Sequence, residues 1–335
     1  MNVNILKFFR SKKNIRLTEF IYSYCNKSKR GAAHIRFYRR LAVLIEEFES
    51  SIHREVYTDS FTDNVVDEYI HFIRSSQPLK KGHNAYRQST VRNFIQKTIA
   101  ILNKAARSGY TVDLESFREL QVPDEDCESV YLTVDELERI YSLSLKNEMA
   151  QIRDIFLIGC CTALRYSDYS RLSEQNFQEN GSITILTQKT NTKVTIPIHY
   201  LIKDIISRNN GYMFLKYQHS QQNFNKVVKT ICKKAGINAK VLVERTEGFK
   251  KVRKTYKKYE LISSHTARRS GATNMYLANI PIFRIMLITG HKTEAAFFRY
   301  IRIRKEENAL FLQQHPFFSR QLKSEIDNSQ EAILA

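Results

Sequence analysis

The sequence predicts a mainly helical protein with a small β-sheet, an α+β class, built as two domains. Three observations predict it. Apolar residues recur at helical spacing along much of the chain, alternation marks residues 182–198, and an acidic stretch separates two basic parts. We place the boundary in that stretch, with a helical N-terminal domain over residues 1–122 and a second domain, including the C-terminal tail, over residues 130–335.

The net charge of +19 is the strongest signal in the composition. Residues 1–110 carry 20 Lys and Arg against 9 Asp and Glu, residues 111–148 carry 3 against 11, and residues 149–335 carry 30 against 14. Such an excess indicates a polyanionic partner, most simply nucleic acid, although a merely basic soluble protein is the alternative. Two basic blocks joined by an acidic linker suggest a clamp around one duplex.

Other features of the composition exclude several protein classes. No apolar run reaches the roughly 20 residues that span a bilayer, so no membrane partner is expected. The N-terminus lacks the apolar stretch and cleavage site of a signal peptide. Five cysteines form no CxxC pair, which indicates neither a disulfide framework nor a zinc site. We therefore expect a cytoplasmic protein.

Amphipathic segments over residues 34–52, 62–75 and 89–110 predict a helical bundle in the first domain. In the last segment the apolar stripe comprises Val91, Phe94, Ile95, Thr98, Leu102 and Ala105. Basic residues lie outside that stripe. Solvation explains any single basic face, but the excess of Lys and Arg over acids favours phosphate contact, and the candidates are Arg87, Arg92 and Lys97.

The second domain begins with a capping box at Thr133 and Glu136, followed by an apolar helix over residues 151–168. The alternation then predicts a β-hairpin with a turn near Asn191, and helices follow to about residue 236. Six Lys and Arg lie within residues 250–258, which we interpret as a ribbon against DNA. Its candidate contacts are Lys250, Lys251 and Arg253.

Several common catalytic motifs are absent from the sequence. It contains no GxxxxGK[ST] phosphate loop, no HExxH, no Cys/His cluster and no persuasive set of paired carboxylates. We therefore predict no metal site and no cofactor.

Isolated basic residues in apolar or small-residue contexts are the stronger signal, because a charge is costly to bury without a partner. Arg165 ends the apolar run "LIGCCTALR", His265 and Arg268 lie in "SSHTARRSGAT", His291 follows Gly290, and Lys189 lies at the hairpin turn. Each alone has a structural explanation, such as a charge at a helix C-terminus or a hydrogen-bonded core imidazole. Together those explanations become weak.

The order of these motifs resembles one family. "TALRYSD", "QKT", "HTARRSGAT", "ITGH" and a tyrosine nine residues later are similar to the catalytic set of the tyrosine recombinases, the phage-integrase family, especially integrases of bacterial mobile elements. The resemblance is strongest over residues 130–312 and looser over 1–110, where the family has a basic, helical core-binding domain. The catalytic residues that it implies are Arg165, Lys189, His265, Arg268, His291 and Tyr300.

The resemblance implies an acidic residue in a supporting role at Asp168, orienting Arg165 or capping the next helix. Two positions depart from the family pattern. Arg269 stands where many members have histidine, and Ile288-Thr289 replaces the commoner hydrophobic-leucine pair before Gly-His. Neither departure removes a catalytic group.

The resemblance implies a site-specific recombinase that needs neither metal nor ATP. Tyr300 attacks a phosphate to form a 3′-phosphotyrosine while two arginines, Arg165 and Arg268, bind the non-bridging oxygens. His265 is the first candidate for general base and Lys189 for general acid. His291 either donates to a phosphate oxygen or supports the tyrosine.

Helical geometry adds a constraint to this interpretation. Nine residues would put His291 and Tyr300 on opposite faces of one helix, so we expect a helix start after His291, opened or capped by Thr293 or Glu294, with Tyr300 inside the new helix.

The expected partners are double-stranded DNA and further copies of the chain. The apolar tail residues Ala309, Leu310, Leu312, Phe317 and Phe318 either pack on their own protomer or, as the resemblance implies, dock on a neighbour in a tetramer on two duplexes. The expected role is integration or excision of a mobile element in a bacterial cytoplasm, with the nucleoid. A DNA invertase or dimer resolvase of the same chemistry and a non-catalytic DNA-binding regulator remain alternatives.

Overall fold

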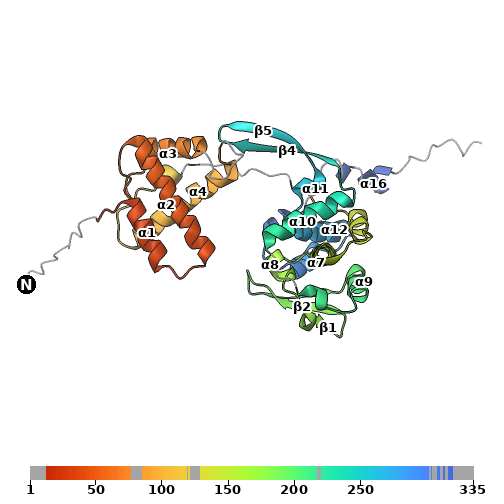
Figure 1. Cartoon of the computed structure of the whole chain (residues 1–335). Helices are drawn as coiled ribbons and strands as arrows, with labels where there is room; N and C mark the ends of the chain where they lie inside the picture. The colour runs from red at the N-terminus through yellow and green to blue at the C-terminus, as the bar shows by residue number, and fades with distance from the viewer. Residues whose placement is uncertain are drawn as a thin grey trace, which may run out of the picture. The chain divides into compact units, whose positions relative to one another are not determined.

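The computed structural model describes residues 13–76, 85–118, 120, 129–216, 220–301 and 303, with short pieces at 308–309, 312–313 and 316–319. The predicted class is confirmed, because helices dominate and the strands form one three-stranded sheet and one two-stranded hairpin (Figure 1). No described helix is long and apolar enough to cross a bilayer.

The chain divides into two compact units. The first unit takes the helices before residue 128 and also residues Leu242–Thr255, which lie far away in sequence. The second takes the other elements. The predicted domain limits of 1–122 and 130–335 stay a prediction.

The first unit is a helical bundle built around its longest helix. Its helices are α1 (Leu17–Lys27), α2 (Ala32–Ile52), α3 (Asp63–Ser75), α4 (Gln88–Arg107) and α5 (Glu115–Arg118). Helix α2 packs against α1, α3 and α4. Every residue of the apolar stripe predicted on α4 is buried, so this prediction is confirmed. Helix α1 was not predicted from the sequence, although Leu17, Phe20 and Ile21 bury one face of it.

Two long strands, β4 (Lys240–Glu247) and β5 (Lys250–Lys257), form the hairpin that contributes to the first unit. Gly248 turns the hairpin with a positive φ of 59°, and its N–H donates to the Tyr86 carbonyl at 2.8 Å. A Cβ at this position would lie 2.7 Å from the Arg74 carbonyl, so only glycine fits. The Phe249 ring lies 5.0 Å from the His71 ring. The basic segment is therefore a strand, as predicted.

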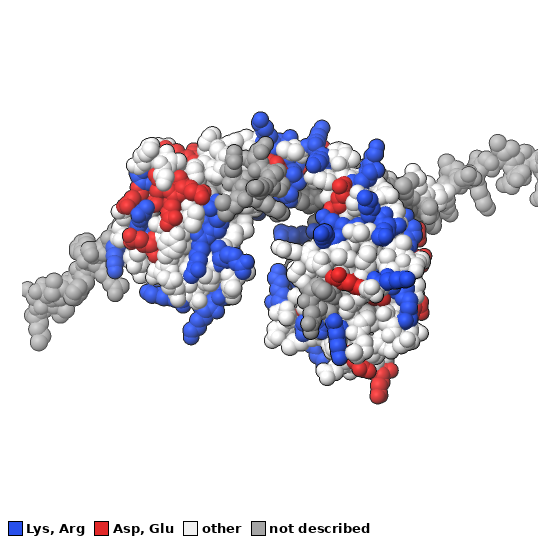
Figure 2. Space-filling model, in the orientation of Figure 1, with Lys and Arg blue, Asp and Glu red and all other residues white. Residues whose placement is uncertain are grey.

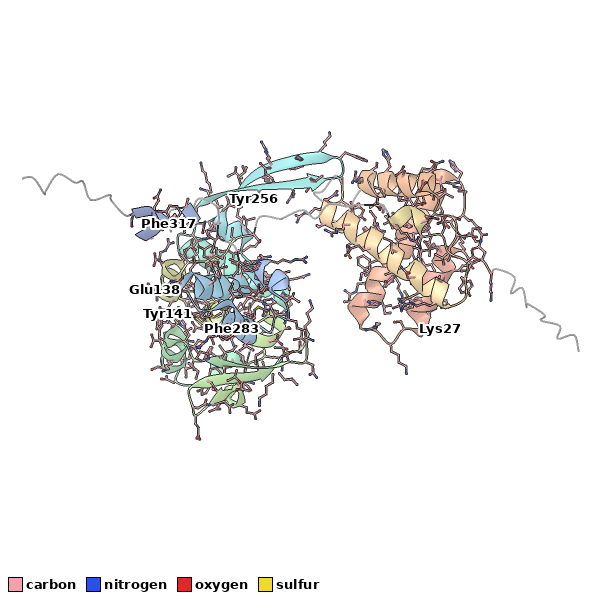
Figure 3. The ribbon with its side chains drawn as sticks, turned by 180° about the vertical axis from the view of Figure 1, so that it is seen from behind. Lys27, Glu138, Tyr141, Tyr256, Phe283 and Phe317 are labelled. Atoms are coloured by element: carbon pink, nitrogen blue, oxygen red, sulfur yellow. The ribbon has the colours of Figure 1, made fainter. Side chains whose placement is uncertain are left out.

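The second unit contains the three-stranded sheet and most of the remaining helices. In chain order its elements are α6 (Val134–Tyr141), α7 (Asn147–Thr162), α8 (Tyr166–Tyr169), η1 (Glu174–Asn176), β1 (Phe177–Gln178), β2 (Ser182–Leu186), β3 (Lys193–Pro197), α9 (Tyr200–Arg208), η2 (Met213–Leu215), α10 (Gln221–Lys234), α11 (Lys258–Leu261), α12 (Ser264–Leu277), α13 (Ile282–Thr289), α14 (Glu294–Phe298) and α16 (Pro316–Ser319). The predicted capping box at Thr133 opens α6. Tyr141, labelled in Figure 3, lies at the end of α6, and the Arg208 guanidinium lies 4.3 Å from its ring centroid.

Helix α7 is the centre of the second unit. Its residues 152–160 are all buried, because α12, α10, α9, α6 and α8 pack around it. The antiparallel sheet has the order β1-β2-β3, and its pairs Ile183–Ile196 and Ile185–Val194 bury the side chains that the alternation predicted. Asn191 takes a positive φ of 50° in the connecting turn, where the sequence predicted it.

Small residues let α7 and α12 approach closely. A Cβ added at Gly271 would lie 2.4 Å from the Cys160 carbonyl and 2.8 Å from the Ala163 Cβ. The close approach brings the C-terminal end of α7 against the middle of α12. This contact positions the residues described in the next subsection.

We predict that Gly271→Ser destabilises the protein by about 1–3 kcal/mol, because the added side chain must force the two helices apart. Thermal unfolding of the DNA-free protein measures the effect. Gly31→Ser is the matched control, since Gly31 has no atom within 4 Å of an added Cβ and occupies a helix N-cap that serine favours. Equal melting temperatures for the two variants would contradict the prediction.

Candidate active site

The Arg268 guanidinium is the centre of the candidate site. It is only 1% exposed, yet no carboxylate of the described residues forms an ion pair with it. Nη1 donates to the Ala163 carbonyl at 2.9 Å, and Nη2 donates to the Thr289 carbonyl at 2.7 Å. Nη2 also lies 3.0 Å from His291 Nε2. Three of the five guanidinium N–H groups are engaged by these contacts, and the guanidinium also forms a side-chain hydrogen bond with Tyr300. The buried Nε–H has no partner among the described residues and can bind an anion.

Both carbonyls come from the ends of helices. Ala163 ends α7 in the left-handed conformation, with φ 53°, and Gly290 ends α13 in the same way, with φ 67°. The last carbonyls of a helix lack intrahelical partners and carry partial negative charge. They stabilise the buried guanidinium without neutralising it, so the site keeps its positive charge.

Arg165 follows the same helix end and adds a second positive charge. Its Nη1 and the Nε of Arg268 are both buried, and neither has a hydrogen-bond partner among the described residues. Each such group costs free energy unless a ligand binds it. The charge of Arg165 also lowers the pKa of Arg268, which shows that the two guanidinium groups are close enough to interact. A doubly charged, under-satisfied pair is suited to the two non-bridging oxygens of a phosphate.

Asp168 is fully buried beside this pair, but no hydrogen bond joins it to Arg165 among the described residues. Its Oδ1 accepts the backbone N–H of Gln188 at 2.8 Å, directly before Lys189. Asp168 therefore supports the backbone of the hairpin turn and does not orient Arg165. Lys189 is exposed in that turn and contributes positive charge at His265.

Tyr300 lies against both histidines and Arg268. Its ring centroid is 4.7 Å from the His291 ring, 5.3 Å from the His265 ring and 5.0 Å from the guanidinium carbon of Arg268. The structure therefore brings these four side chains together. His265 and Arg268 share one face of α12, three residues apart.

The predicted break between His291 and Tyr300 is confirmed. Helix α13 ends at Thr289, His291 lies in the link, and the Thr293 hydroxyl accepts from the Ala296 N–H at the start of α14. The prediction that Tyr300 lies inside the new helix is wrong. Helix α14 ends at Phe298, and Tyr300 follows in a turn closed by its N–H on the Phe297 carbonyl at 2.8 Å.

Burial and nearby positive charge keep both histidines neutral. Burial first, and then the charges of Arg269 and Arg268, lower the pKa of His265 to about 4. Burial, with Arg268 and Arg165, lowers the pKa of His291 to about 4. Burial, and then repulsion by Arg165, lowers the pKa of Arg268 to about 10, so it stays charged at neutral pH. The DNA-free site therefore combines charged arginines with proton-accepting imidazoles.

The six residues predicted to contact DNA lie outside this cluster. Lys250 and Lys251 are exposed on β5, whereas Arg253 is 2.7 Å from the Glu244 carboxylate. In the first unit, Arg87 is exposed at the start of α4, and Arg92 and Lys97 are partly exposed on it. Figure 2 shows Lys and Arg side chains along the hairpin, and in the first unit it shows basic and acidic side chains on different parts of the surface. The DNA contacts themselves stay a prediction.

Three contributors to the site were not predicted from the sequence. Two are backbone carbonyls, those of Ala163 and Thr289, and the third is the Thr289 hydroxyl, 2.8 Å from His291 Nδ1. The departure from the family pattern at Thr289 was the one available signal. A backbone carbonyl leaves no signal in a sequence.

Comparison with known families identifies the chain. The model of the phage integrase family matches residues 130–307, and that of the phage integrase SAM-like domain matches residues 16–117. The chain belongs to the phage integrase family. The first match includes every residue of the candidate site, and the second includes helices α1–α4 and all of α5 except its last residue.

Solved structures show the same fold at low sequence identity. The Tn1549 transposon integrase (residues 82–397), in complex with circular intermediate DNA, has 15% identity and a TM-score of 0.60, covering 89% of this chain and 99% of that chain. The lambda integrase dimer bound to a COC′ core site has 14% identity and a TM-score of 0.61, covering 87% and 78%. The XerH recombinase bound to palindromic difH has 15% identity and a TM-score of 0.60, covering 89% and 84%. No curated protein sequence matches the chain.

The lowered pKa values predict that stability falls on acidification. The unfolded chain binds protons at His265 and His291 near pH 6.5, whereas the folded protein resists them until about pH 4. The free energy of unfolding should therefore decrease as the pH falls from about 6.5 to about 4. Thermal unfolding between pH 7 and pH 4.5 measures this loss.

The double variant His265→Gln/His291→Gln should lose less stability over that range than the wild type. The control is His53→Asn, which replaces an exposed histidine in the first unit and should show the wild-type loss. An equal loss in the double variant would contradict the assigned pKa shifts.

Proposed function

We propose that the protein is a site-specific DNA recombinase, an integrase of a mobile element, that cleaves and rejoins DNA through a covalent bond to Tyr300. One observation carries the proposal. The Tyr300 ring lies within 5.3 Å of two neutral histidines and Arg268, beside buried guanidinium N–H groups without partners. Such a site suits a phosphodiester and an attacking oxygen.

In the proposed reaction the Tyr300 hydroxyl oxygen attacks the phosphorus atom of the scissile phosphate. The bond from phosphorus to the 5′ oxygen breaks, which leaves a 3′-phosphotyrosine and a free 5′-hydroxyl. Arg165 and Arg268 bind the non-bridging oxygens, where negative charge grows in the transition state. Attack by the 5′-hydroxyl reverses the step and rejoins DNA, so the ester bond energy is kept.

Two proton transfers accompany each cleavage. The Tyr300 hydroxyl loses its proton to a neutral imidazole, with His265 as first candidate and His291 as a second neutral ring in contact with the same tyrosine. The leaving 5′ oxygen gains a proton from Lys189 in the hairpin turn. Asp168 supports this step by holding the backbone of that turn at Gln188.

We assign DNA binding to both basic parts of the chain. Residues 1–122 would act as the core-binding domain and residues 130–335 as the catalytic domain, in keeping with the two family matches. The proposed phosphate contacts are Arg87, Arg92, Lys97, Lys250, Lys251 and Arg253. The structural relatives named above include proteins in complex with DNA.

We further propose that the working assembly is a tetramer on two duplexes, in the bacterial cytoplasm with the nucleoid. Apolar side chains near the end of the second unit support an interface: Phe283 on α13 is 62% exposed and Phe317 on α16 is 80% exposed (Figure 3). Leu310, like most of the tail around it, lies outside the described residues. A DNA invertase or dimer resolvase would use the same chemistry and differ in its DNA sites.

The covalent intermediate provides the direct test of the proposed function. A footprint of the protein on the DNA that flanks its gene first defines the protected segment. The substrate is a nicked half-site with the sequence of that segment. The wild type should form an adduct that survives denaturation, in the presence or absence of EDTA, and Tyr300→Phe should form none. Tyr276→Phe, on α12 and outside the cluster, is the control. An adduct with Tyr300→Phe, or none with the wild type, would contradict the mechanism and favour a non-catalytic regulator.

The hairpin should contribute to DNA affinity through charge. Replacing Lys250 and Lys251 together with Gln removes two phosphate contacts, so the slope of log K against log salt should decrease in magnitude by about 2. Fluorescence anisotropy on the footprint duplex at several salt concentrations measures it. Arg54→Gln removes an exposed charge that pairs with Glu68 and is the control. An unchanged slope in the double variant would exclude the hairpin from the DNA interface.

A further inference from the structure

Thr289 contacts two of the proposed catalytic residues at once. It is the last residue of α13 and is 1% exposed. Its carbonyl accepts from Arg268 Nη2 at 2.7 Å. Its hydroxyl oxygen lies 2.8 Å from His291 Nδ1 and 2.8 Å from the Ile285 carbonyl.

The guanidinium determines which nitrogen of the His291 ring carries the proton. An arginine can only donate, and Arg268 Nη2 lies 3.0 Å from Nε2, so Nε2 must accept. A neutral imidazole with an accepting Nε2 carries its hydrogen on Nδ1. The Thr289 hydroxyl then accepts that Nδ1–H and donates its own hydrogen to the Ile285 carbonyl. All three groups are satisfied by this one arrangement.

We propose that Thr289 is a positioning residue for the reaction, whose hydroxyl holds the Nδ1–H of His291 so that Nε2 faces the reacting groups. The inference rests on the proposed function of Tyr300 and goes beyond it, because it assigns a role to a residue that touches no reacting atom. A leucine, which the family pattern favours at this position, would offer Nδ1–H no acceptor.

The arrangement serves both protonation states of His291. In the DNA-free protein the lone pair of Nε2 accepts from Arg268, so Nε2 can take a proton from Tyr300, or donate to a phosphate oxygen, only after that contact opens. Nδ1–H remains on Thr289 in both protonation states. The other charged or titratable groups that face His291 are Arg268 on α12, Arg165 after α7 and Tyr300 after α14. None of them can accept Nδ1–H in place of the hydroxyl, because the described structure gives Nδ1 no other hydrogen-bond partner.

The first experiment observes the tautomer directly in the DNA-free protein. In ¹⁵N-histidine-labelled protein at pH 7, the His291 signals, assigned by their loss in His291→Gln, should show a protonated Nδ1 and an unprotonated Nε2. Thr289→Ser keeps the hydroxyl and should keep this pattern. Thr289→Val, of nearly the same shape, leaves Nδ1–H in place opposite Arg268 but without an acceptor, so the Nδ1 signal should move and its hydrogen should exchange faster with water. A protonated Nε2 in the wild type, or an unchanged Nδ1 signal and exchange rate in Thr289→Val, overturns the inference.

The second experiment measures adduct formation on the nicked half-site. Thr289→Val should slow the step about 10-fold, because the buried Nδ1–H loses its partner. Thr289→Ser should restore most of the rate. In the His291→Gln background Thr289→Val should have no further effect, since a double-mutant cycle isolates the coupling. Melting temperature and DNA affinity, measured in parallel, should change little.

The outcomes separate this inference from the proposed function. A wild type that forms no adduct contradicts the proposed function, and the tautomer pattern still tests the hydrogen bond itself. A wild type that forms the adduct together with a Thr289→Val variant of equal rate contradicts the role of Thr289 alone. A slowed rate that persists in the His291→Gln background also overturns it, because the effect would then not act through His291.

Discussion

The candidate site depends on a buried cation that forms no ion pair with an acidic side chain of the described residues. Arg268 is 1% exposed, and its hydrogen-bond partners include two main-chain carbonyls and an imidazole nitrogen. Such an arrangement is costly unless the carbonyls are well placed. The close packing of α7 on α12 at Gly271 places the first carbonyl, and the end of α13 places the second. The packing of α7, α12 and α13 thus holds these two helix ends around one guanidinium.

A carboxylate paired with Arg268 would favour the stability of the folded protein but would hinder its function. A carboxylate on Arg268 would cancel the charge that a phosphate must find. Helix C-termini supply partial charges only, so the cation is retained and the remaining N–H groups stay available. Burial, together with the same positive charge, lowers the pKa of His265 and of His291, so Tyr300 meets proton acceptors. The retained charge therefore adds to the effect of burial on both rings.

The sequence predicted those features of the fold that short-range patterns of residues determine. The stripe on α4 and the β2–β3 alternation are local, and both are buried as expected. It did not predict contacts that depend on tertiary structure, such as Asp168 on the Gln188 N–H. The prediction that Tyr300 lies inside a helix was wrong because α14 has only five residues. A helix that short shows no periodicity in the sequence from which its end could be predicted. The assignment of Leu242–Thr255 to the first unit likewise requires the folded chain.

The support of Arg268 by main-chain carbonyls has a consequence for evolution. Substitution of a side chain cannot delete a carbonyl oxygen, so most point mutations at Ala163 or Thr289 leave this support chemically intact. The vulnerable property is the backbone path: both helices end in left-handed turns, at Ala163 and Gly290. Side-chain substitutions around the guanidinium should therefore preserve this support wherever the two turns survive.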